Sequence, residues 1–125
     1  MCQALRLNQV AIVEREHDVG QLVQAMLADS YTEIAAGRSL VLTVAAAYDA
    51  GTDQAAGPSS AKLFCSEMVS RVADRGVQVH GGLGYMSSTA VERMYRDSRL
   101  YRLYEGTSEI QKLIIARALL APASS

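Results

Sequence analysis

The sequence predicts an all-α fold, an antiparallel up-and-down four-helix bundle. Apolar residues recur at steps of three and four along most of the chain, which is the period of an amphipathic helix. Strand-like alternation does not extend beyond Val77 and Val79, and there is no internal repeat. The segments between the helical stretches are short, which favours antiparallel neighbours. With 125 residues the chain is long enough for one domain but not for two.

The first predicted helix is the longest. Asp18 is placed to cap its start, although Gly20 weakens the first turn, and Gly51 lies where the helix should stop. Steps of three and four put one set of residues on a single face of this helix: Val23, Leu27, Tyr31, Ile34, Arg38, Val41, Ala45 and Tyr48.

The second predicted helix follows the turn Gly57-Pro58-Ser59-Ser60, in which the proline can occupy the first helical position. We expect it to end near Gly81-Gly82-Leu83-Gly84, because clustered glycines destabilise a helix. One face carries Ala61, Phe64, Met68, Val72 and Gly76, and Cys65, Val69 and Ala73 lie beside it.

Two shorter helices complete the prediction. Thr89 and Glu92 have capping-box spacing and predict a third helix towards Arg99. After a loop from Leu103 to Thr107, Ser108 and Gln111 have the same spacing, and the last helix is expected over Glu109 to Leu120.

Composition excludes several classes of function. Positive and negative residues are interspersed at a net charge of −1, so a nucleic-acid role has little electrostatic support. The longest largely apolar stretch, Leu40 to Tyr48, is too short to span a membrane. Met1 to Val13 lacks the pattern of a signal peptide, so we expect a reducing, cytoplasmic setting.

Cys2 and Cys65 lie too far apart for a metal knuckle and His17 has no partner at ligand spacing, so no metal site is expected. Cys65 is read as a buried, inert thiol.

Three segments admit both a functional and a structural interpretation. Gly82-Leu83-Gly84 has part of a dinucleotide-loop pattern, but no strand precedes it, so a helix-ending turn that also permits close approach of another molecule is favoured. His80 packs in that turn or contacts a ligand. For Tyr95-Arg96-Asp97-Ser98-Arg99, structural ion pairing is favoured over substrate binding.

Glu105 stands apart from the other acidic residues. It lies in Tyr104-Glu105-Gly106-Thr107, immediately before a predicted helix start. Aromatic neighbours would desolvate its carboxylate and raise its pKa, as suits a general base. From the residues alone, a simple loop glutamate remains the alternative.

Four motifs together resemble the acyl-CoA dehydrogenase family in order and spacing. They are Gln78-Val79-His80-Gly81-Gly82-Leu83-Gly84-Tyr85, Val91-Glu92-Arg93, Tyr95-Arg96-Asp97-Ser98-Arg99 and Tyr104-Glu105-Gly106-Thr107-Ser108-Glu109-Ile110-Gln111. Upstream, Ala35-Ala36-Gly37-Arg38, Ala45-Ala46 and Asp49-Ala50-Gly51 resemble the first long helix of the family's C-terminal domain. The match runs from about Leu22 to Leu120. We therefore expect a poorly matched segment at 1–19, the bundle at 20–121 and a tail at 122–125.

The resemblance implies α,β-dehydrogenation of an acyl-CoA thioester with FAD as cofactor. Glu105 matches the base that removes the α-proton while a β-hydride passes to flavin N5, and Gly106 matches the residue beside the acyl chain. Gln78, Gly81 and Gly82 match a segment that reaches the FAD of a neighbouring subunit, whereas Thr107 and Glu109 match FAD contacts near a helix start. The resemblance also implies a homo-oligomer and an electron-accepting flavoprotein as partners.

The departures from the family pattern limit what the chain does alone. It lacks the helical and β-barrel domains that cover the flavin, the arginine-bearing segment before the first long helix, and the proline usual before Val91. We therefore expect catalysis only when the missing domains or a partner chain complete the site. The alternative is a non-catalytic helical assembly module from a truncated family member.

Overall fold

The computed structural model describes residues 20–121, and the regular elements in this range are all helical. They are α2 (Gln21–Asp49), α3 (Ala56–His80), the 3₁₀ turn η1 (Gly81–Tyr85), α4 (Ala90–Leu100) and α5 (Ser108–Leu120). This confirms the predicted all-α fold with four helices.

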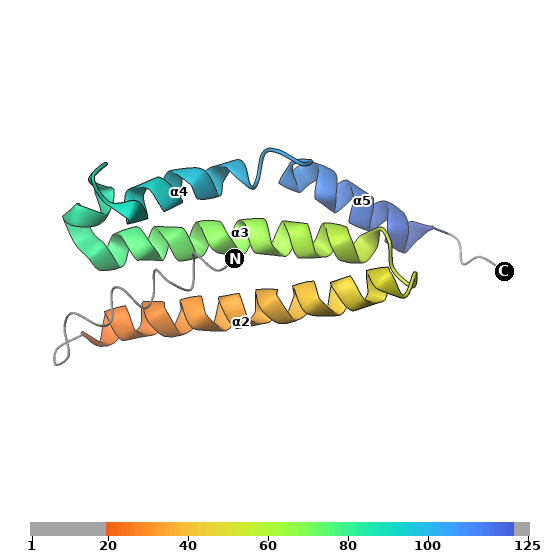
Figure 1. Ribbon diagram of the computed structural model, residues 1–125, viewed down its shortest axis with the longest axis horizontal. Coiled ribbons are helices and arrows are strands. Elements are labelled where there is room, and N and C mark those ends of the chain that lie inside the picture. The colour runs from red at the N-terminus through yellow and green to blue at the C-terminus, as the bar shows by residue number, and fades with distance from the viewer. Residues whose placement is uncertain (1–19, 122–125) are drawn as a thin grey trace.

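Helix α3 is the centre of the arrangement and packs against every other element. Figure 1 shows α2 along one side of α3, while α4 and α5 follow one another along its other side. Both α4 and α5 run antiparallel to α3, so the chain does not reverse between them. The described chain is consequently three helical rows wide, and the loop between α4 and α5 lies alongside the middle of α3.

The core lies between α2 and α3 and is small. Ile34, Met68 and Val72 are each at most 3% exposed, and Phe64 packs against them. The predicted apolar face of α3 is therefore confirmed.

The predicted face of α2 is wrong in part. Tyr31, Arg38 and Tyr48 are exposed, whereas Ser30 and Gly37 are buried with Ile34. Small residues let α3 approach this side of the helix closely, and the buried Ser30 hydroxyl donates to the Met26 carbonyl at 2.7 Å.

The helix ends agree with the sequence at most positions. Gly51, at φ 71°, follows α2, and α3 stops at His80 before Gly81. Asp18, the expected cap of α2, lies outside the described residues. Helix α3 begins at Ala56 rather than at Pro58, which lies in the first turn, where its missing N–H removes no helical hydrogen bond.

The two N-caps of the shorter helices are both threonines. The Thr89 hydroxyl accepts from the Glu92 N–H at 3.4 Å, which confirms the predicted cap of α4. The cap of α5 is Thr107, which accepts from the Ile110 N–H at 3.4 Å. The predicted Ser108 cap is wrong by one residue.

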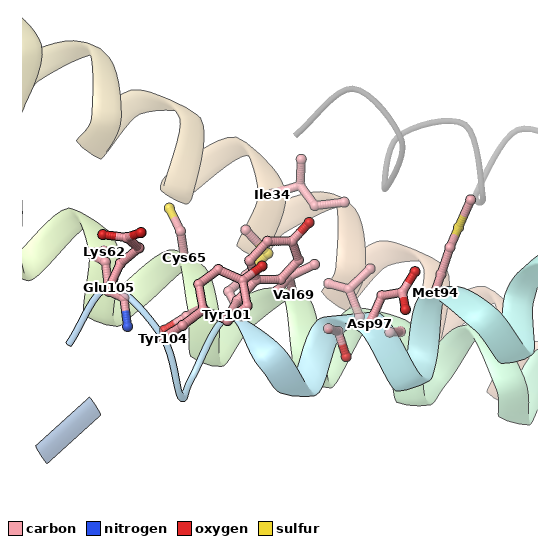
Figure 2. Close-up of a pocket in the computed structure, with 14 residues that line it drawn as sticks. Ile34, Lys62, Cys65, Val69, Met94, Asp97, Tyr101, Tyr104 and Glu105 are labelled. Atoms are coloured by element: carbon pink, nitrogen blue, oxygen red, sulfur yellow. The ribbon is translucent and has the colours of Figure 1, made fainter. Parts of the chain in front are cut away.

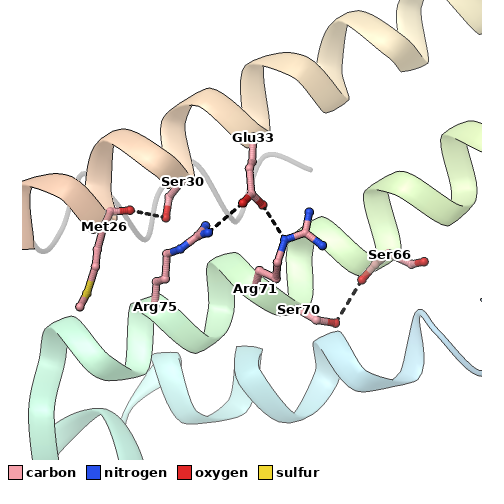
Figure 3. A network of polar contacts seen from close by, with 7 residues as sticks. All are labelled: Met26, Ser30, Glu33, Ser66, Ser70, Arg71 and Arg75. Atoms are coloured by element: carbon pink, nitrogen blue, oxygen red, sulfur yellow. Dashed lines mark hydrogen bonds and ion pairs between the residues drawn. The ribbon is translucent and has the colours of Figure 1, made fainter.

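Charged side chains tie α2 to α3 beside the core. Figure 3 shows the Glu33 carboxylate between Arg71, whose Nε lies 3.0 Å away, and Arg75, whose Nη2 lies 2.8 Å away. Burial raises the pKa of Glu33, but the hydrogen bonds from Arg75 and Arg71 outweigh burial, and the net pKa lies below its ordinary value.

Among the described helices, none combines the length and the apolar character needed to cross a membrane.

Candidate active site

The loop between α4 and α5 carries Glu105 in an unusual backbone conformation. Glu105 has φ 56° and Gly106 has φ 83°, so two successive residues occupy the left-handed region. Glu105 is the one residue other than glycine with a positive φ in residues 20–121. Such a conformation costs energy and persists where surrounding contacts hold it. Glycine adopts the φ of 83° at position 106 without strain, and a Cβ added there would lie 2.7 Å from Gln111 Nε2, so the Gln111 amide would have to shift.

Two donors from different helices hold the tip of this loop. Lys62 Nζ, from α3, donates to the Gly106 carbonyl at 2.5 Å. Gln111 Nε2, from α5, donates to the Glu105 carbonyl at 3.1 Å and lies 3.4 Å from the Gly106 carbonyl. Gln111 is buried, so its amide has a fixed place from which to donate.

Glu67 of α3 holds the base of the loop. Its Oε1 accepts from Arg102 Nε at 2.9 Å and from the Ser108 hydroxyl at 2.7 Å, one residue on each side of the turn. The Ser108 N–H closes the loop onto the Arg102 carbonyl at 3.3 Å. Burial raises the pKa of Glu67, but the bonds from Ser108 and Arg102 together lower it below its ordinary value.

Glu105 borders a groove of about 380 Å³. Its walls are formed by α3, α4, the loop between α4 and α5, and Ile34 of α2. Figure 2 shows Tyr101, Tyr104 and Glu105 along its wall. The rings of Tyr101 and Tyr104 lie 6.0 Å apart at an interplanar angle of 53°. Most other lining side chains are apolar: Ile34, Met68, Val69, Val72, Ala73 and Met94. Glu105 itself is exposed, so the described residues alone do not provide the desolvation expected from its aromatic neighbours.

The glycines after α3 serve different purposes. Gly81, at φ 59°, lets the chain leave the helix. A Cβ on Gly84 would lie 2.6 Å from the Val77 carbonyl oxygen, so Gly84 is required for packing against α3. A Cβ on Gly82 would meet nothing within 4 Å. The described residues therefore give no reason for glycine at position 82. His80 packs in this turn, with Nδ1 2.8 Å from the Gly76 carbonyl oxygen.

The candidate site residues fall into two groups. Gln78, Gly81 and Gly82 are exposed around the end of α3 and the start of η1, whereas Glu105, Gly106, Thr107 and Glu109 gather at the start of α5. Lys62, beside Gly106, and Gln78 are sixteen residues apart on α3, which corresponds to about 24 Å along the helix. The chain therefore does not bring the two groups into one place by itself.

The start of α5 concentrates backbone donors. The Thr107 hydroxyl caps the helix by accepting from the Ile110 N–H. The pKa of Glu109 lies below its ordinary value because its own backbone N–H and the Thr107 hydroxyl hydrogen-bond the carboxylate.

Within residues 20–121, no group of His, Cys, Asp and Glu side chains could hold a metal ion.

Comparison with known proteins decides the family. The profile described as "Acyl-CoA dehydrogenase, C-terminal domain" matches residues 9–120. The chain belongs to the acyl-CoA dehydrogenase family. It is 42% identical over 104 residues to a cyclohexane-1-carbonyl-CoA dehydrogenase of Geobacter metallireducens, a match covering 83% of this chain and 27% of that protein. It is 47% identical over 100 residues to a probable acyl-CoA dehydrogenase of Bacillus subtilis, covering 80% of this chain and 26% of the relative.

The solved structures agree with the sequence matches. An acyl-CoA dehydrogenase of Geobacillus kaustophilus superposes with a TM-score of 0.85 at 37% identity, covering 94% of this chain and 32% of that one. The chain thus corresponds to the C-terminal helical domain of an acyl-CoA dehydrogenase and spans about a quarter of the length of the curated relatives it matches.

Lys62 and Glu67, which anchor the loop of this acyl-CoA dehydrogenase domain, were not predicted from the sequence. One signal was present, because both are charged residues in the half of α3 that otherwise carries apolar and small side chains. Arg96 pairs with Glu92 one turn earlier in α4, which supports the structural interpretation of that charged segment. Cys65 is half-buried, and burial raises the pKa of its thiol, as expected for an inert cysteine.

Proposed function

We propose that this domain contributes the catalytic base of a flavin-dependent acyl-CoA dehydrogenase, with Glu105 removing the α-proton of an acyl-CoA thioester. The observation that carries the proposal is the placement of Glu105 in an anchored, left-handed turn at the edge of a mostly apolar groove. Strained backbone held by surrounding contacts is concentrated at functional sites.

The chemistry requires one carboxylate. The thioester acidifies the α-carbon, so an ionised Glu105 can take the α-proton onto a carboxylate oxygen while the electrons left on the α-carbon form the double bond. Gly106, adjoining the base, has no side chain to obstruct an acyl chain there. Bound FAD would supply the acceptor for the β-hydride. The other domains of the completed enzyme, or a partner chain, would cover the groove and exclude water from the carboxylate.

The residues proposed to hold FAD suit a site shared between two subunits. Thr107 and Glu109, at the first turn of α5, would contact the cofactor that Glu105 serves, where helix N–H groups favour phosphate oxygens. Gln78, about 24 Å from Lys62 along α3, and Gly81 and Gly82 just after that helix would contact the cofactor of a neighbour. The open space around Gly82 supports this assignment, because a partner could approach the backbone there.

The same proposal includes a homo-oligomer, an electron-accepting flavoprotein as partner and a cytoplasmic location. Support for association comes from large apolar side chains that α2 and α5 leave at least half exposed. They are Leu22, Leu42, Tyr31, Tyr48, Leu113, Leu119 and Leu120.

The deciding experiment replaces Glu105 in the enzyme completed with its flavin-binding domains. Glu105→Gln keeps the shape of the side chain but removes the base, so dehydrogenation should fall by about 10²- to 10⁴-fold while flavin absorbance is retained. Asp74→Asn, at an exposed position of α3, is the control for removing one carboxylate and should remain active. Undiminished activity of Glu105→Gln would remove the proposed role.

The exposed apolar faces also favour a second candidate, a non-catalytic assembly module. A visible spectrum and mass analysis of the chain purified from its native host separate the two. Stoichiometric flavin absorbance with a second polypeptide supports the dehydrogenase, whereas a colourless homo-oligomer supports the module.

A further inference from the structure

We propose that Lys62 and Gln111 are positioning residues that aim the Glu105 carboxylate by holding the two peptide carbonyls of its turn. This inference rests on the proposed role of Glu105 as the base. Neither residue is assigned to the chemistry, and they reach the turn from different helices, α3 and α5.

The backbone of Glu105 is in the left-handed region, which a glutamate adopts at a cost, and the chain leaves it directly through Gly106 in the same region. The orientation of a side chain follows the backbone that carries it. If the Glu105–Gly106 segment relaxed to ordinary dihedrals, its carbonyls would turn and the carboxylate would point elsewhere. Lys62 and Gln111 donate to these two carbonyls and so oppose that relaxation.

Lys62 forms its hydrogen bond with a backbone carbonyl and not with an acidic side chain. Among the ion pairs within residues 20–121, none includes Lys62, although its side chain is partly buried at the groove. Its ammonium group instead donates to a neutral carbonyl, forty-four residues away in sequence. A charge-assisted bond to a peptide carbonyl is stronger than a neutral one and fixes backbone geometry.

The base and the tip of the loop are held by different residues. Glu67 binds Arg102 and Ser108 and thereby fixes where the loop begins and ends. Lys62 and Gln111 bind only the tip that carries the candidate base. Loss of either tip donor should therefore leave the loop attached to α3 and change the direction of Glu105.

The test uses the enzyme completed with its flavin-binding domains and compares Lys62→Met and Gln111→Met with the wild type. We expect kcat to fall by about 10- to 100-fold, as for a small misplacement of a catalytic group. The α-deuterium isotope effect should rise, because α-proton removal becomes more fully rate-limiting. KM should stay within about twofold and flavin content should not change. Lys62→Arg keeps a cationic donor and should recover part of the lost rate.

Lys112→Met is the matched control, because it makes the same substitution at an exposed lysine on α5. It should leave kcat and the isotope effect unchanged. Should Lys62→Met fail to fold, Gln111→Met decides the question by itself.

Two results would overturn the inference: an unchanged isotope effect in the folded variants, or a fall in kcat that only matches a fall in flavin content. Inactive Glu105→Gln together with a normal Lys62→Met would reject this inference alone. Active Glu105→Gln would reject the proposed function itself.

Discussion

Gly37 of α2 faces Met68 of α3 so closely that a Cβ built on Gly37 would lie 3.1 Å from Met68 Cε. Phe64 and Cys65 are nearly as close, with Phe64 Cε1 at 3.3 Å and Cys65 Sγ at 3.5 Å from the same point. The two helices are therefore in contact at a position where only hydrogen fits without displacement. This contact lies beside the core residues Ile34 and Val72.

Gly37→Leu should overpack this contact and lower the free energy of unfolding by about 1–3 kcal/mol. The control is Ala36→Leu, at the exposed neighbouring position of the same helix, which should change stability by less than about 0.5 kcal/mol. Denaturant unfolding of the two variants provides the comparison. Equal stability of both would mean that α2 and α3 are not packed through Gly37.

The Glu33 ion pairs should make stability depend on pH in the acid range. Because the pKa of Glu33 is lowered in the folded protein, its contribution is fully present above the ordinary value of 4.5 and is lost as pH falls through the lower, folded pKa. The partly exposed pairs should contribute about 1 kcal/mol. Glu33→Gln should abolish this part of the pH dependence in unfolding measured between neutral and acid pH.

Asp29→Asn removes a carboxylate from an exposed position one turn earlier in α2 and serves as the control for that measurement. It should retain the acid dependence that Glu33→Gln loses. An identical pH profile for wild type and Glu33→Gln would show that the Arg71 and Arg75 pairs do not couple to folding.

Gly82 and Gly84 offer a matched pair for separating folding from cofactor binding. Gly84→Ala would press a methyl group against the Val77 backbone, so it should lower stability by about 1–3 kcal/mol. The methyl group of Gly82→Ala would meet open space, so the free energy of unfolding should stay within about 0.5 kcal/mol of the wild type. The same variant should retain less flavin if the FAD of a neighbouring subunit contacts the backbone at position 82. Thermal unfolding and the flavin-to-protein absorbance ratio of the completed enzyme provide the two measurements. Full flavin retention by a stable Gly82→Ala would exclude that contact.

The difference between α3 and α2 shows what hydrophobic periodicity can predict. On α3 the buried residues include Met68 and Val72, whose size and apolarity mark the face that is buried. On α2 the buried residues include Ser30 and Gly37, while Tyr31 and Tyr48 are exposed. A hydrophobic pattern gives tyrosine more weight than glycine as a buried residue. It therefore predicts the wrong part of the α2 surface for the contact with α3. Two helix backbones approach closely only where the residues between them are small. The hydropathy of such residues does not indicate where that approach occurs.

The candidate site was predictable only where residues adjacent in sequence carry it. Tyr104-Glu105-Gly106-Thr107 stands out as a motif, and the helix start that follows it was predicted to within a residue. The bond from Lys62 to the Gly106 carbonyl joins a side chain to a backbone atom, so no residue type at position 106 reports its presence. The same applies to Gln111, whose spacing suggested a cap although its amide holds the preceding turn.

The placement of α5 has a consequence for the order in which the domain folds. The α2–α3 and α3–α4 pairs are each joined by a short connection, so each pair can form from that connection outward. Helix α5 has no such connection to α3 and must reach it across the whole of α4, which makes its docking the slower, non-local step. The bonds from Lys62 and Glu67 of α3 to the loop around Glu105 depend on this non-local step. The helices themselves need no such step, whereas the anchored turn that carries Glu105 does.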